Sequence, residues 1–229
     1  MNGINRRYCL CYLGLSLIGI GSTGFHACLR WEWQLLDELP MIYVVSWSAY
    51  LCFDTLPSFK PRFGNFGYAA VLFWCIFVTF SYLYLPNPIY HQIAFAFILI
   101  SAVVRNIFLI QRVPQGHPII AHVTRTMAWG VLTFAGGFTI WNIDNIFCTQ
   151  LRAVRESIGW MGFLLEGHGI WHLMTGYGAF LIFTAAIYLN LAVKVSPEAY
   201  TFDSHVYLPL VYPVLPAVSE ENKSNREKT

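Results

Sequence analysis

Charged residues are scarce in this chain of 229 residues. They make up 11% of it, while 56% of the residues are hydrophobic; a soluble globular chain is roughly a quarter charged. The net charge of +2 is small and no basic block interleaves with aromatics, so nucleic acid is not an expected partner. The six cysteines include no CxxC pair, which argues against a zinc finger. Neither strand-like alternation nor an internal repeat runs through the chain. The expected class is a helical membrane protein.

Long hydrophobic stretches are what the chain has instead. A helix needs about 20 mostly apolar residues to cross a bilayer. We predict six such spans, at about residues 8–26, 39–56, 66–85, 90–110, 122–142 and 161–193. The predicted fold is therefore all-α, a polytopic membrane helix bundle of six spans over residues 8–193. A cytoplasmic tail (1–7) precedes it, and a cytoplasmic tail (194–229) that is expected to be disordered follows it.

Lysine and arginine are unevenly shared between the two sides of this topology. One side collects Arg6, Arg7, Lys60, Arg62, Arg112 and Lys194, and the other collects Arg30, Arg152 and Arg155. Basic residues favour the cytoplasmic side of a membrane protein. This distribution predicts that both termini lie in the cytosol.

Five polar residues lie near the ends of the apolar stretches. Ser22 and His26 are at the end of the first span, and Asp37 directly precedes the second. His168 and His172 are four residues apart near the start of the last span. The topology predicts all five at one depth, on the non-cytoplasmic side. Ionisable groups are rare within membrane spans, so this set indicates a functional site.

The three histidines suggest a metal. Residues four apart share a helix face, and three imidazoles plus a water form an open catalytic zinc site. Zinc lowers the pKa of its bound water to about 7 and polarises a carbonyl. In this hypothesis His26, His168 and His172 bind Zn2+. Asp37 takes the proton of the water, and Ser22 hydrogen-bonds the water or the developing oxyanion.

Simpler explanations exist for the individual residues. A single histidine in an apolar helix is more often a hydrogen-bonded core residue than a ligand. Glu166, close to the histidine pair, fits either a supporting role beside the metal or an acid at a helix N-terminus. It is the joint pattern that favours zinc.

Two pairs of motifs carry a resemblance to a known family. Residues 21–26 (GSTGFH) and 34–43 (QLLDELPMIY), then 141–145 (WNIDN) and 167–176 (GHGIWHLMTG), resemble the alkaline ceramidase family, in the right order over about residues 6–193. The resemblance implies a seven-helix membrane bundle with zinc on His26, His168 and His172, and Ser22 and Asp37 in the site. It also implies hydrolysis of the ceramide or phytoceramide amide to a sphingoid base and a fatty acid at alkaline pH. The lipid would come from the bilayer of the endoplasmic reticulum or Golgi.

The resemblance also implies an additional N-terminal helix, preceded by an acidic and aromatic segment that resembles a calcium site. Only 21 residues precede Ser22, so that helix and the calcium ligands are expected to be missing here. One more helix in front would give seven spans and leave the C-terminus cytoplasmic.

Two other functions stay open at this point. The wider superfamily shares the Ser-x3-His, Asp and His-x3-His pattern and includes the progestin and adiponectin receptors. A lipid sensor with a structural zinc would therefore carry the same motifs and bind its ligand without turnover. A truncated, inactive member of the ceramidase family is the second alternative.

Overall fold

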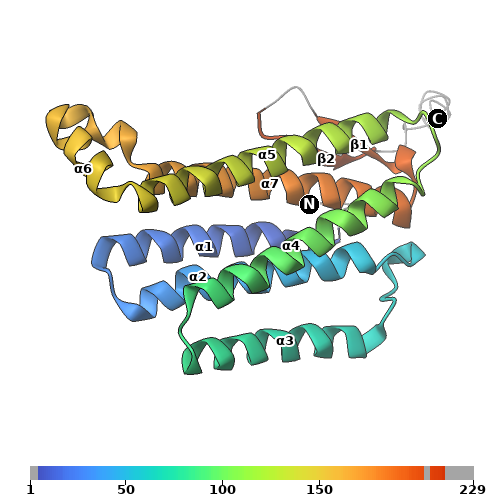
Figure 1. The fold of residues 1–229 in the computed structure, drawn as a ribbon. Coiled ribbons are helices and arrows are strands. Elements are labelled where there is room, and N and C mark those ends of the chain that lie inside the picture. Colours follow the sequence, from blue (N-terminus) through green and yellow to red (C-terminus); the bar gives the residue numbers. More distant parts are fainter. Residues whose placement is uncertain (1–4, 204–206, 215–229) are drawn as a thin grey trace, which may run out of the picture.

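The structure is a computed structural model that describes residues 5–203 and 207–214 (Figure 1). Within these residues, six long helices lie side by side along one direction. They are α1 (Cys9–Cys28), α2 (Trp31–Phe53), α3 (Gly64–Tyr84), α4 (Pro88–Ile110), α5 (Pro118–Ile146) and α7 (Gly167–Lys194). The prediction of an all-α helix bundle is confirmed.

Four segments of the described chain are long and apolar enough to cross a membrane. They are Arg6–Cys28, Gly64–Tyr84, Ile89–Ile110 and Gly159–Lys194. The helices α2 and α5 do not meet this measure, and α2 carries three carboxylates, those of Glu32, Asp37 and Glu38. Both helices nevertheless pack along the others, α2 against α1 and α4, and α5 against α7. Each predicted span therefore corresponds to one helix of the bundle.

The start of the second helix differs from the prediction. The sequence places the second span at about residue 39, but α2 begins at Trp31 and contains Pro40. A proline is tolerated within a helix of a membrane bundle because neighbouring groups satisfy the freed backbone atoms. Asp37 consequently lies inside α2 and not in a loop before it.

The helix α7 occupies the centre of the bundle. Its residues 181–192 are all buried, and it contacts α1, α2, α4 and α5. Gly130 of α5 and Gly178 of α7 let two backbones meet: a Cβ added to Gly178 would lie 2.8 Å from the carbonyl oxygen of Gly130. Small residues at such crossings permit the close packing that holds membrane helices together.

The C-terminal tail contains an element that the sequence analysis missed. Strands β1 (Tyr200–Asp203) and β2 (Leu210–Pro213) form a two-stranded antiparallel sheet. Phe202 stacks on Tyr188 of α7 with ring centroids 5.1 Å apart. The expectation of disorder is therefore wrong for these strands, because Tyr200 and Phe202 of β1 are buried and Phe202 packs on α7. Residues 215–229 lie outside the described part of the chain.

A buried charged cluster connects the start of α1 with the ends of α2 and α7. The carboxylate of Asp54, just after α2, is fully buried and accepts a hydrogen bond from the guanidinium of Arg7. It also accepts from the backbone N–H of Arg62 at 2.7 Å, and Lys194 Nζ lies 3.6 Å away. Because Arg7 precedes α1 and Lys194 ends α7, the start of the first long helix and the end of the last lie at the same end of the bundle.

We expect Asp54→Ala to destabilise the protein strongly. The substitution leaves the buried Lys194 ammonium without its counter-charge, and breaking a buried ion pair costs about 3–5 kcal/mol. The matched control is Glu32→Ala, whose carboxylate pairs with Arg30 on the surface and should change the free energy of unfolding by less than about 1 kcal/mol. Unfolding in detergent micelles measures both. Equal stability of the two variants would contradict a structural role for Asp54.

Candidate active site

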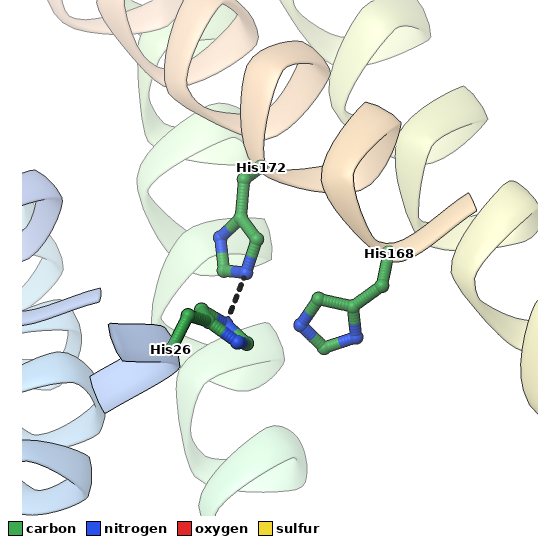
Figure 2. Close-up of side chains that lie close together, drawn as sticks. All are labelled: His26, His168 and His172. Carbon is green, nitrogen blue, oxygen red and sulfur yellow. Dashed lines mark hydrogen bonds between the residues drawn. The ribbon is translucent and has the colours of Figure 1, made fainter. Parts of the chain in front are cut away.

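Three histidines converge at the end of the bundle opposite the charged cluster (Figure 2). His26 comes from the last turns of α1, and His168 and His172 come from the first turns of α7. Their ligand nitrogens all lie within 4.8 Å of one another. The structure thus brings together the histidines that the sequence analysis selected; His26 and His172 are 146 residues apart in the sequence.

Ser22 and Asp37 lie beside the histidines because α1 and α2 meet at a glycine. A Cβ added to Gly21 would lie 2.3 Å from the carbonyl oxygen of Leu36. This contact places Ser22, the next residue in α1, against Asp37, the residue after Leu36. The Asp37 carboxylate interacts with the Ser22 side chain, and Ser22 Oγ is 3.3 Å from His172 Nδ1. Ser22 therefore connects Asp37 with His172.

The spacing of two of the three histidines fits a tetrahedral metal ion. His26 Nε2 and His172 Nε2 are 3.0 Å apart, close to the ~3.3 Å between two nitrogens that bind one zinc at about 2.0–2.1 Å. A metal-binding histidine usually donates its second ring N–H to an acceptor, and the Ser22 hydroxyl can accept from His172 Nδ1. The exposed side of His26 leaves the cluster open for a further ligand.

Trp141 of α5 contacts His168. The sequence analysis did not select Trp141 as a site residue. Its indole N–H donates to His168 Nδ1 at 3.1 Å. A neutral imidazole that accepts at Nδ1 carries its proton on Nε2. Metal binding through Nε2 would move that proton to Nδ1, so the Trp141 indole would then have to shift. The sequence signal for Trp141 was its place at the start of the WNIDN motif.

An arginine of the short helix α6 (Cys148–Ser157) fixes the start of α7. Arg155 donates to Glu166 Oε2 at 2.7 Å and to Asp144 Oδ1 of α5. Glu166, for which the sequence left two roles open, therefore pairs with Arg155, two residues before His168. These two contacts of Arg155, called the Arg155 clasp below, join the end of α5 to the beginning of α7. The beginning of α7 carries two of the three histidines.

Comparison with known proteins decides the family. The sequence model of the Ceramidase family matches residues 1–218. The chain belongs to the ceramidase family. It is similar to "Alkaline ceramidase 3" of Mus musculus, at 36% identity over 203 residues that cover 84% of this chain and 72% of the mouse protein. It is also similar to "Alkaline ceramidase YPC1" of Saccharomyces cerevisiae, at 31% identity over 83% of this chain and 64% of the yeast protein.

A more distant relative is "Putative alkaline ceramidase dcd3A" of Dictyostelium discoideum, which is 27% identical over 78% of this chain and 63% of its own length. The resemblance found in the sequence motifs is thus confirmed. Membership of this family makes the chain an amide hydrolase of the ceramidase type.

We expect Gly21→Ala to impair this ceramidase. The new methyl group would overlap the backbone of α2 at Leu36, so α1 would move away and separate Ser22 from Asp37. Gly19→Ala, in the same helix, is the matched control because an added Cβ meets nothing within 4 Å there. It should leave activity unchanged and stabilise the helix by up to about 1 kcal/mol. Activity and melting temperature of the two variants test this; equal activity would show that the α1–α2 contact does not position the site.

We expect Arg155→Met to impair hydrolysis, and any metal binding by the histidines, through the position of His168. The variant loses both bonds that hold the start of α7, and loss of a supporting group around a metal site typically costs about 10–100-fold in affinity or activity. Arg152→Met, on the exposed surface of α6, should have no effect. Metal content and hydrolysis rate measure the difference. A normal Arg155→Met enzyme would contradict the clasp's role.

Proposed function

We propose that this ceramidase is a zinc-dependent intramembrane amidase that hydrolyses ceramide or phytoceramide to a sphingoid base and a free fatty acid. The observation that carries the proposal is the cluster of His26, His168 and His172 with Ser22 and Asp37 beside it. The relatives named as alkaline ceramidases support the substrate class.

The histidines, Asp37 and Ser22 have different roles in the proposed hydrolysis. Each histidine would hold the metal through one ring nitrogen, and bound zinc would supply a Lewis acid for the amide carbonyl and acidify a water. Asp37 accepts the proton of the attacking water. It then returns that proton to the nitrogen as the C–N bond breaks. The Ser22 hydroxyl donates to the carbonyl oxygen as negative charge develops there.

The surroundings of the cluster suit a lipid substrate. Leu29, just after α1, is 74% exposed, and Leu173, next to His172, is 76% exposed. Apolar side chains that are exposed in a membrane bundle face lipid, so the surface beside the histidines is apolar. A ceramide could present its amide there while its chains stay in the hydrocarbon.

The proposed membrane is that of the endoplasmic reticulum or Golgi, with both chain ends in the cytosol. The uneven distribution of lysine and arginine supports this orientation. The histidine cluster would then act from the lumenal half of the bilayer.

The test compares three variants of the purified protein. His172→Ala should lose both zinc and hydrolysis of labelled phytoceramide at neutral and alkaline pH. Asp37→Asn should keep about one zinc per chain and lose about 10²–10⁴-fold in turnover, the usual contribution of a general base. His122→Gln, in α5 near the other end of the bundle, should resemble the unchanged protein.

The outcomes separate the functions. Hydrolysis by zinc-free protein would overturn the proposed chemistry. Zinc and specific ceramide binding without turnover would favour a lipid sensor.

A further inference from the structure

A cavity lies at the end of the bundle that is opposite to the histidines. Its volume is about 570 Å3. The segment between α2 and α3, the loop after α4, and the end of α7 form its walls. The residues that matter to the argument are Thr55, Leu56, Arg62, Arg112 and Val193. The proposed hydrolysis uses none of them.

The cavity carries excess positive charge. Arg62 and Arg112 both line it, and Arg105 of α4 is close enough to interact with both. Over residues 5–203 and 207–214, none of these three guanidinium groups forms an ion pair with a carboxylate. Three like charges that lack a counter-charge repel one another, so an anion would be stabilised here.

The neighbouring carboxylate cannot neutralise this charge. Asp54 is fully buried, and its oxygens are taken by Arg7, by Lys194 and by the backbone N–H of Arg62. The side chain of Arg62 points elsewhere, with a long contact of 3.4 Å to the Thr55 hydroxyl. Arg62 and Arg112 are therefore available to a ligand.

The chemistry of the walls indicates the class of anion. Guanidinium groups match the oxygens of a phosphate and bind them through two hydrogen bonds, and Thr55 adds a hydroxyl. We propose that this cavity binds a phosphate group, carried by an anionic phospholipid or free in solution. The apolar walls of Leu56 and Val193 favour a phosphate that carries an apolar part, as does the anionic surface of the cytoplasmic leaflet. Such a ligand would join the loops after α2 and α4 to the end of α7.

The test measures thermal unfolding of the full chain in detergent, with inorganic phosphate, phosphatidic acid or phosphatidylcholine added at constant ionic strength. The main variant is Arg112→Gln, because this side chain lines the cavity and supports no ion pair among the described residues. The double variant R62Q/R112Q removes the second group. The control is Lys60→Gln, an exposed residue of the same loop that does not line the cavity.

Inorganic phosphate or phosphatidic acid, but not the zwitterionic phosphatidylcholine, should raise the melting temperature of the unchanged protein and of Lys60→Gln. Arg112→Gln should need about tenfold more ligand for the same shift, since a hydrogen bond to a charged group is among the strong ones. A response to inorganic phosphate identifies a site for the free anion, and a response to phosphatidic acid alone identifies a lipid headgroup. Equal responses of Arg112→Gln and Lys60→Gln, an equal effect of phosphatidylcholine, or no shift with any ligand would overturn the proposal.

Discussion

Polar side chains inside a membrane bundle must find their partners within the protein, because lipid offers none. The rest of this structure depends on that constraint. At one end Asp54 gathers Arg7, Lys194 and a backbone N–H. At the other end three histidines, a serine and an aspartate gather around an opening. The first cluster is nearly complete in itself and stabilises the fold. In the second cluster the ring nitrogens of three histidines face one another, and a bound cation would stabilise this arrangement.

One helix links these two clusters. The first turns of α7 carry His168 and His172, and its last residue is Lys194. A rotation or shift of α7 would therefore disturb both clusters at once. The backbone contact between Gly130 and Gly178 and the Arg155 clasp at the start of α7 both restrict such a movement. The position of the three histidines is thus a property of helix packing along the whole bundle.

The sequence was sufficient for the helices and for the five residues of the candidate site. Hydrophobic length predicts spans, and an alternating topology then places His26 and His168 at one end. It could not reveal Trp141 or Arg155 as neighbours of the histidines, because those contacts depend on how α5, α6 and α7 pack. The small sheet at Tyr200 and the early start of α2 were missed for a similar reason, because each depends on contact with another helix, which overrides local composition. Tyr200 is buried, and Leu36 of α2 lies against Gly21 of α1.

The position of Ser22 shows what the structure adds to the Ser-x3-His sequence motif. Its hydroxyl has one proton to donate and two lone pairs, and it lies between His172 Nδ1 and the Asp37 carboxylate. While Asp37 is ionised, it attracts the hydroxyl proton, so Ser22 is not free to donate elsewhere. In the proposed reaction Asp37 becomes neutral when it takes the proton from water. The same event weakens its hold on Ser22 and frees that hydroxyl for the carbonyl oxygen. Proton transfer and stabilisation of the oxyanion are thereby coupled through one side chain, which neither residue could achieve if α1 and α2 were farther apart.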